Sequence, residues 1–192
     1  MKIEFVIPTY NRSKLLMATI SSLYAQTNDN WTAHIVTDNY WDDYLEKIKN
    51  FYADSDKIRF TITDKRYNDW GHTPRNIGLK QCKEEWVIMT GDDNYYVPVF
   101  VDEFLKVVKT ETNVVFCNMV HNWNNLQYYP VKCIPRTNNI DIGCFMVRSK
   151  LGSQMEINLE HKELADGMFL EEYIKRFAGS VEHIDKILYT HN

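Results

Sequence analysis

Short apolar runs alternate with amphipathic stretches along the first two thirds of the chain. The apolar runs have the length and β-branched content of strands buried in a sheet, and they cover residues 3–7, 33–37, 58–62, 86–89 and 113–119. Hydrophobic side chains recur at helical spacing in the segments between them, which are residues 16–24, 44–52, 74–82 and 100–108. Asn11 is placed to cap the first helix, and Pro98 to begin the last. This alternation predicts a mostly parallel sheet covered by helices on both faces.

The last third of the chain has a different pattern. Residues 122–147 are predicted to be mainly extended, including a segment at 140–147, and they are followed by a helix over 164–177 and a closing strand over 181–189. No repeat, low-complexity stretch or flexible linker divides the chain. The predicted fold class is therefore a single α/β domain that adds a smaller mixed part to a Rossmann-like sheet.

Polar residues follow each of the first four predicted strands. They are Pro8-Thr9-Tyr10-Asn11-Arg12, then Asp38-Asn39, then residues 64–69, and then Asp92-Asp93-Asn94. Ligands of open α/β sheets bind beyond the carboxyl ends of the strands. Four such loops at one sheet edge predict a binding site there.

The loop Asp92-Asp93-Asn94 is the most informative of the four. It directly follows the apolar strand 86–89, where unpaired buried charge would be costly. Two carboxylates and an amide oxygen are hard donors that suit Mg²⁺ or Mn²⁺ bound together with substrate phosphates. The spacing alone leaves a second interpretation open, a solvated turn that caps the helix beginning near Pro98.

Composition narrows the functional classes. The chain has 192 residues, 44% of them hydrophobic, and a net charge of −4, which fits one globular domain without a general nucleic-acid surface. Its four cysteines form no CxxC pair, so we expect reduced thiols rather than zinc or disulfides. A strand-like start and the lack of an apolar stretch of about 20 residues predict a cytoplasmic protein without a transmembrane segment.

The seven glycines are scattered and form neither GxGxxG nor GxxxxGK[ST], which argues against a dinucleotide site and a P-loop. Four ordered segments instead resemble the motifs of family 2 glycosyltransferases with the GT-A fold. These are Val6-Ile7-Pro8-Thr9-Tyr10-Asn11-Arg12, Val36-Thr37-Asp38-Asn39, His72-Thr73-Pro74-Arg75-Asn76-Ile77-Gly78-Leu79 and Thr90-Gly91-Asp92-Asp93-Asn94-Tyr95-Tyr96-Val97-Pro98. The resemblance covers most of residues 1–110 and is weaker beyond. Gly91 departs from the commonest acidic motif, because it stands where many members carry the first aspartate.

The resemblance implies an inverting transferase that moves a hexose, by default glucose or galactose, from a UDP-sugar to a saccharide or glycan hydroxyl. It implies Mn²⁺, or Mg²⁺, as the cofactor. Residues 1–97 would form the nucleotide-sugar-binding half and residues 98–192 the acceptor-binding half of one GT-A domain, alone or within a larger protein.

The resemblance also assigns individual residues. Those implied to hold the nucleotide sugar are Pro8, Thr9, Tyr10, Arg12, Asp38, Arg75, Asn76, Asp92, Asp93 and Gly143. Asp38 would bind the uracil or ribose and Arg75 the nucleotide or phosphates, while Asp93, Asp92 and His191 would hold the metal. Plainer roles remain open: a turn cap for Asp38, a surface salt bridge for Arg75, a strand bulge at Gly143 and simple solvent exposure for His191.

Asp166 is implied to be the catalytic base that accepts the proton of the acceptor hydroxyl. A helix N-cap is the alternative role, and Glu171 and Glu172 are the next candidates for the base. Trp70, Trp123, Tyr128 and Tyr129 are able to stack on a sugar ring, although aromatic residues more often fill a core.

Two other functions stay open at this point. A catalytically silent nucleotide-sugar or glycan-binding module would carry the same motifs, and a sugar-phosphate nucleotidyltransferase has a similar layout. The second is disfavoured because such enzymes carry a glycine-rich loop after the first strand, which this chain lacks.

Overall fold

The computed structural model describes residues 1–123, 127–160 and 163–192; the side chain of Trp123 lies outside the described part. The described residues form one nine-stranded sheet with the order β3-β2-β1-β4-β8-β6-β9-β5, and β7 pairs with β6 outside this path. The strands are β1 (Ile3–Thr9), β2 (Trp31–Thr37), β3 (Ile58–Ile62), β4 (Trp86–Met89), β5 (Tyr95–Tyr96), β6 (Thr112–Trp123), β7 (Gln127–Val131), β8 (Phe145–Arg148) and β9 (Ser180–His191). The predicted α/β fold class is confirmed.

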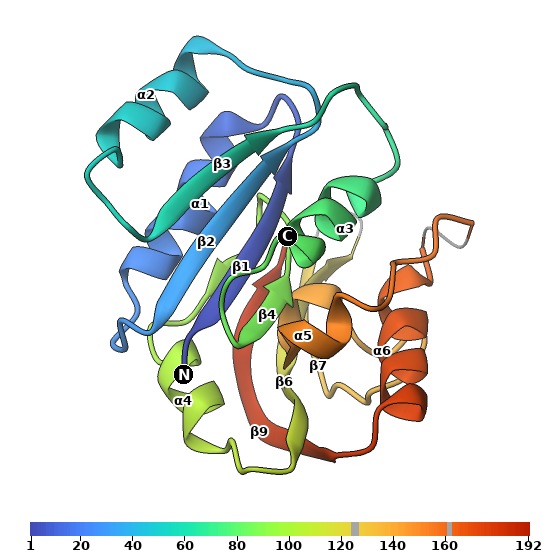
Figure 1. The fold of residues 1–192 in the computed structure, drawn as a ribbon. Coiled ribbons are helices and arrows are strands. Elements are labelled where there is room, and N and C mark those ends of the chain that lie inside the picture. The colour runs from blue at the N-terminus through green and yellow to red at the C-terminus, as the bar shows by residue number, and fades with distance from the viewer. Residues whose placement is uncertain (124–126, 161–162) are drawn as a thin grey trace.

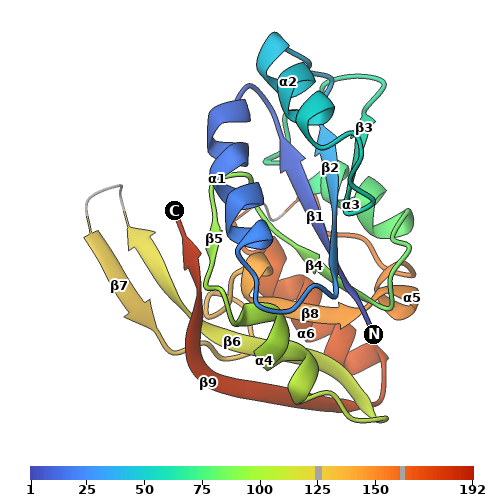
Figure 2. The same cartoon turned by 90° about the vertical axis from the view of Figure 1, so that its left-hand side faces the viewer.

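The first four strands of this order are parallel, as the alternating pattern predicts. β8 is antiparallel to both β4 and β6, and it joins the parallel part to the pair formed by β6 and β9. The helices are α1 (Ser13–Tyr24), α2 (Asp43–Phe51), α3 (His72–Lys80), α4 (Phe100–Lys106), α5 (Ser149–Gly152) and α6 (Ala165–Arg176), with a 3-10 turn, η1 (Ile142–Cys144). α1 and α3 cover opposite faces of the parallel strands (Figures 1 and 2).

The core lies between the parallel strands and the helices. Three aromatic side chains of this core are fully buried: Phe5 of β1, Tyr96 of β5 and Phe100 of α4. The ring of Tyr96 meets the other two edge to face, with its centroid 4.9 Å from that of Phe5 and 4.7 Å from that of Phe100. This contact fixes the loop after β4 against β1. The acidic residues on that loop are therefore held on a rigid support.

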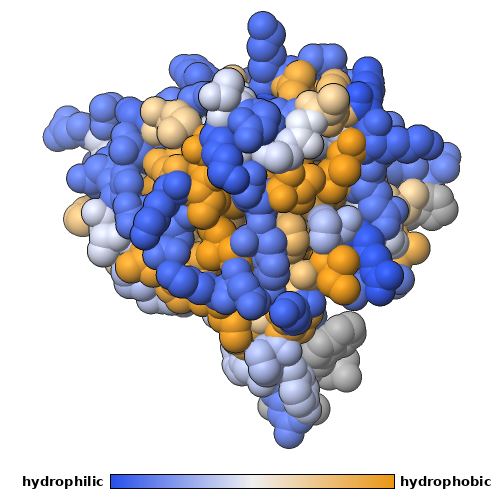
Figure 3. Space-filling view, turned by 90° about the horizontal axis from the view of Figure 1, so that it is seen from below, coloured by the Kyte–Doolittle hydropathy of each residue, from blue (hydrophilic) through white to orange (hydrophobic). Residues whose placement is uncertain are grey.

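β6 and β9 bend around the lower part of the molecule (Figure 2). Their parallel register shifts between Thr112 and Val114 and twice between Cys117 and Met119, and such irregularities bend a strand pair. The bend carries the end of β9 upward, where it pairs with β5 and brings His191 close to the loop after β4. The outer side of β9 exposes Val181 and Ile187, and hydrophobic residues gather on the face of the molecule seen from below (Figure 3).

Two local predictions are wrong. Asn11 does not cap α1: its φ of 51° makes a left-handed turn at the end of β1, and Arg12 occupies the cap position without a side-chain cap. The segment 140–147 is not extended throughout, because the Asp141 carboxylate accepts a hydrogen bond from the Gly143 amide (2.8 Å) and folds residues 142–144 into η1.

Candidate active site

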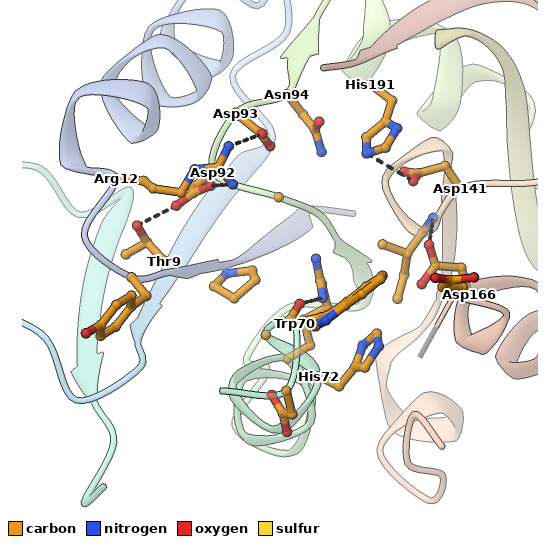
Figure 4. Close-up of a pocket in the computed structure, with 18 of the residues that line it drawn as sticks. Thr9, Arg12, Trp70, His72, Asp92, Asp93, Asn94, Asp141, Asp166 and His191 are labelled. Carbon is orange, nitrogen blue, oxygen red and sulfur yellow. Dashed lines mark hydrogen bonds and ion pairs between the residues drawn. The ribbon is translucent and has the colours of Figure 1, made fainter. Parts of the chain in front are cut away.

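A cavity of about 990 Å³ lies at the carboxyl ends of β1, β2 and β4 and extends to the mixed part of the sheet. Figure 4 shows side chains from both parts of the chain facing it. Of the residues predicted to form the site, its lining includes Pro8, Thr9, Tyr10, Arg12, Asp38, Arg75, Asp92, Asp93, Asp166 and His191. Its volume is in the range typical of small-molecule sites.

The acidic loop faces this cavity and does not cap a helix. Asp92 is only 4% exposed, and its carboxylate accepts a hydrogen bond from the Thr9 hydroxyl (2.7 Å). Arg12 forms ion pairs with both Asp92 (3.2 Å) and Asp93. Val99, which has no side chain able to cap, occupies the N-cap position of α4, so the solvated-turn interpretation is wrong.

Burial raises the pKa of Asp92 to about 6, although the Thr9 hydroxyl and Arg12 act in the opposite direction. At pH 7 the Asp92 carboxylate is therefore mainly ionised, and the Arg12 guanidinium pairs with it and with Asp93. His191 lies at the same rim, with its Nε2 3.8 Å from Asp141, and its buried Nδ1 has no hydrogen-bond partner. Within the described ranges, no group of three or more His, Cys, Asp or Glu side chains is arranged to hold a metal ion.

One end of the cavity is built by β1, β2 and the loop after β3. Asp38 is buried, and its two carboxylate oxygens accept hydrogen bonds from the backbone amides of Tyr67 (2.8 Å) and Asn68 (3.0 Å). It therefore has the turn-stabilising role while also lining the cavity. The guanidinium of Arg66 lies 3.7 Å from the ring centre of Tyr10, which makes a cation–π contact at the same end.

Arg75 and Asn76 are adjacent on α3 but serve different sites. Arg75 is buried, and carbonyl oxygens rather than a surface carboxylate accept its hydrogen bonds: Nε donates to Thr90 (3.1 Å) and Nη1 to Trp70 (2.9 Å). Asn76 does not line the cavity. Its side-chain amide exchanges two hydrogen bonds with the backbone of Ile157 (2.8 and 3.3 Å), so it ties α3 to that segment instead of facing a ligand.

Asp166 lies in the first turn of α6 and faces the cavity from the opposite side. Its carboxylate accepts a hydrogen bond from the backbone amide of Ile142 (3.2 Å), a residue of another segment, so it does not cap its own helix. Burial and then the charge of Asp141 raise the pKa of Asp166 to about 7, while Arg75 acts to lower it. Glu171 and Glu172 do not line this cavity, and Glu171 binds Thr137 instead.

Asp141 is a carboxylate of the cavity that the sequence did not indicate. It accepts hydrogen bonds from the Gly143 amide (2.8 Å) and the Tyr189 hydroxyl (2.7 Å), and it lines the cavity between Asp166 and His191. Its only sequence signal is its place directly before Ile142-Gly143-Cys144.

Gly143 does not line the cavity, and it lies in η1 rather than in a strand bulge. A Cβ there would lie 2.4 Å from the Tyr189 hydroxyl, so packing explains this glycine. Of the aromatic candidates, Trp70 lines the cavity, Tyr128 and Tyr129 are exposed on β7 away from it, and the side chain of Trp123 is outside the described part.

The comparisons with known proteins agree with this geometry. The model of "Glycosyl transferase family 2" matches residues 4–176. An uncharacterized glycosyltransferase of Haemophilus influenzae is 25% identical over 131 residues, which are 68% of this chain and 39% of that protein. The GalNAc(5)-diNAcBac-PP-undecaprenol beta-1,3-glucosyltransferase of Campylobacter jejuni is 29% identical over 93 residues, 48% of this chain and 30% of that protein.

Solved structures show the same fold. TarS 1-349 of S. aureus in complex with UDP-GlcNAc superposes with a TM-score of 0.78 at 18% identity, covering 99% of this chain and 58% of that one. The mannosyltransferase PcManGT of Pyrobaculum calidifontis in complex with GDP-Man and Mn²⁺ superposes with a TM-score of 0.74 at 11% identity. The match covers 99% of this chain and 56% of that one. These neighbours place the chain in the GT-A fold.

The chain spans 39% and 30% of the lengths of the two curated relatives. None of the helices in the described ranges is long and apolar enough to cross a membrane. The matched family model covers most of the chain, and the cavity lies where its motifs converge. The chain belongs to glycosyl transferase family 2.

Proposed function

We propose that this chain is an inverting glycosyltransferase that uses a UDP-sugar and Mn²⁺ or Mg²⁺. The observation that carries the proposal is the placement of two acidic groups on opposite sides of one cavity, Asp92 with Asp93 on one side and Asp166 on the other. Separate carboxylates with different surroundings are suited to different roles in one reaction. Residues 1–97 would bind the donor and residues 98–192 the acceptor.

The donor end would be held by the loops of the parallel strands. Pro8, Thr9, Tyr10 and Asp38 line the part of the cavity suited to the nucleoside, and Arg12 and Arg75 bring positive charge toward the diphosphate. A solved neighbour bound to UDP-GlcNAc supports a uridine donor, with glucose or galactose as the first sugars to test.

Asp92 and Asp93 would hold the cation together with diphosphate oxygens, and His191 at the same rim would have to move toward them to join, because no three such side chains of the described residues are arranged around one metal position. Carboxylate oxygens and an imidazole without a hydrogen-bond partner on Nδ1 are suitable donors, and a nitrogen ligand favours Mn²⁺. When bound, the cation would stabilise the charge that develops on the leaving diphosphate. The PcManGT complex with Mn²⁺ supports this assignment.

Asp166 would accept the proton of the acceptor hydroxyl as that oxygen attacks the anomeric carbon. Direct attack from the side opposite the leaving diphosphate inverts the configuration. The Ile142 amide orients the carboxylate, and its raised pKa makes it a stronger base than an exposed aspartate.

The test measures UDP release and UDP binding on the full chain with a panel of nucleotide sugars and Mn²⁺. Asp166→Asn should bind UDP as tightly as the wild type and release UDP roughly a hundredfold or more slowly, because only the base is lost. Asp93→Ala should weaken manganese-dependent UDP binding. Glu171→Gln, outside the cavity, is the matched control and should change neither quantity.

Other results would favour the other functions. UDP binding without release of UDP from any donor would indicate a nucleotide-sugar-binding module. Pyrophosphate release from UTP and a sugar phosphate would indicate a nucleotidyltransferase. Wild-type rates in Asp166→Asn would show that Asp166 is not the base.

A further inference from the structure

Trp70 combines an exposed side chain with an unusual backbone. Its side chain is 61% exposed and its φ is 62°. Each of the other non-glycine residues with a positive φ in the described ranges is an asparagine, a residue type that tolerates this conformation. A bulky aromatic residue at positive φ is strained, and strain of this kind is found preferentially at functional sites.

The turn around Trp70 is held from two sides. Arg75 Nη1 donates a hydrogen bond to the Trp70 carbonyl (2.9 Å), and Gly71 (φ 81°) packs so closely that a Cβ on it would lie 2.9 Å from Pro8. These contacts involve the backbone and would be kept by glycine or asparagine at position 70. They explain the turn, but they do not explain an indole.

The indole itself lies in the cavity instead of the core. In Figure 4 it stands in the middle of the cavity, with Thr9 and Asp92 to its left and Asp166 to its right. Apolar side chains such as Ile140, Ile142 and Leu164 line the cavity beside its charged groups, and the Trp70 indole is the largest aromatic surface among the lining residues. The flat face of an aromatic ring is suited to the apolar C–H face of a pyranose.

On the basis of the proposed function, we infer that the Trp70 indole stacks on the ring of the acceptor sugar and so contributes to acceptor specificity. The acceptor is favoured over the donor sugar because the indole remains largely exposed to solvent, where a second substrate would reach it. A ring held there would point one hydroxyl toward Asp166 from the far side of the donor.

The test follows binding directly, because no acceptor is yet identified. The full chain with UDP and Mn²⁺ is titrated with methyl β-glucoside, methyl β-galactoside and methyl β-N-acetylglucosaminide, with sorbitol as the open-chain control. The readout is the indole ¹H–¹⁵N resonance of Trp70, which is identified by its loss in Trp70→Phe. We expect at least one pyranoside, but not sorbitol, to shift this resonance saturably.

Variants then separate stacking from folding. Trp70→Gly should keep or raise the melting temperature, since glycine accepts a positive φ, and should bind the pyranoside roughly tenfold more weakly. Trp70→Phe, which keeps an aromatic ring, should lose less affinity. Phe51→Ala removes an aromatic side chain that is 76% exposed on α2, outside the cavity, and should change nothing.

Three results would overturn the inference: no pyranoside shifts the resonance, Trp70→Gly binds the pyranoside as the wild type does, or UDP-glucose shifts the resonance where UDP does not. The last result would assign the indole to the donor sugar. Calorimetry of UDP with Mn²⁺ distinguishes this failure from failure of the proposed function. If the wild type binds UDP in the presence of Mn²⁺, only the inferred role of Trp70 is wrong. If it does not bind UDP, the proposed function is wrong as well.

Discussion

Asp92 is buried and Asp166 is half-buried, and burial raises the pKa of both carboxyls, to about 6 and about 7, yet their partners differ. Asp92 has the Thr9 hydroxyl and the Arg12 guanidinium beside it, and both favour its ionised form. The carboxylate of Asp166 accepts one hydrogen bond from a backbone amide, and the nearby charge of Asp141 disfavours its ionised form. At pH 7 Asp92 is therefore mainly ionised, as its proposed role of holding a cation requires, whereas Asp166 is poised to exchange a proton.

The pH dependence of transfer should follow Asp166. Only its ionised form accepts a proton, so kcat/KM should rise with pH and level off above a midpoint near 7, being about tenfold below the plateau at pH 6. Initial rates between pH 5 and 9 measure this profile. Glu171→Gln should leave the midpoint unchanged, and a midpoint near 4 would contradict the assignment of the base.

The same carboxyl should make stability depend on pH. The folded-state pKa of Asp166 lies above its ordinary value of 3.8, so the folded state binds the proton more tightly than the unfolded state. Its favourable contribution is complete below pH 3.8 and is lost as the pH rises through 7. Thermal unfolding at pH 5 and pH 8 should therefore show a smaller loss of stability in Asp166→Asn than in the wild type.

The helix α3 positions Arg75 because it packs directly on β1. A Cβ placed on Gly78 would lie 2.2 Å from Cγ1 of Val6, so only glycine allows this approach. Replacing a helical glycine by alanine normally stabilises a helix by up to about 1 kcal/mol. Here we expect the opposite sign, a loss of about 1–3 kcal/mol in the free energy of unfolding from overpacking, measured by chemical denaturation.

The double variant Val6→Ala, Gly78→Ala tests this cause. Removing the two methyl groups of Val6 makes room for the new Cβ, so the two changes should cost less together than the sum of their separate effects. Strict additivity would show that the close contact is not what disfavours alanine at position 78. A stabilised Gly78→Ala single variant would contradict the packing of α3 altogether.

The elements that the sequence predicted well are those specified by local patterns. The strands near residues 3–7, 33–37, 58–62 and 86–89 and the helix over 164–177 all form within a few residues of the predicted bounds. β5 was not predicted, because two residues carry no periodic signal and its partner β9 lies far along the chain. The bend of β6 and β9 depends on register shifts between strands, which a single sequence does not reveal.

The residues of the candidate site also divide into those that local patterns predict and those that only tertiary packing places. Strand order predicts that residues at the ends of parallel strands meet, and Thr9, Asp38 and Asp92 line one cavity. The motifs also indicate Asn76 and Gly143, but in the folded chain Asn76 binds the backbone of Ile157 and Gly143 packs against Tyr189. Asp141 was missed for the same reason, since only the folded chain brings it between Asp166 and His191.

The described residues are organised around a sheet that runs without interruption from the parallel strands to the bent pair of β6 and β9. β8 pairs with both β4 and β6, so the parallel strands and the bent pair share one hydrogen-bonded framework. The cavity is lined from both sides of this junction. Binding there should therefore stabilise the chain as one cooperative unit rather than one half of it.

UDP with Mn²⁺ should accordingly raise the melting temperature of a single transition. A ligand at a hundred times its Kd adds about 2.7 kcal/mol to the free energy of unfolding, which for a chain of this size corresponds to roughly 5–10 °C. Differential scanning calorimetry with UDP alone, Mn²⁺ alone and both together measures the effect, and Asp93→Ala should lose the part that requires both. Two separate transitions, only one of which responds to UDP with Mn²⁺, would mean that the halves fold independently and that the cavity belongs to one of them.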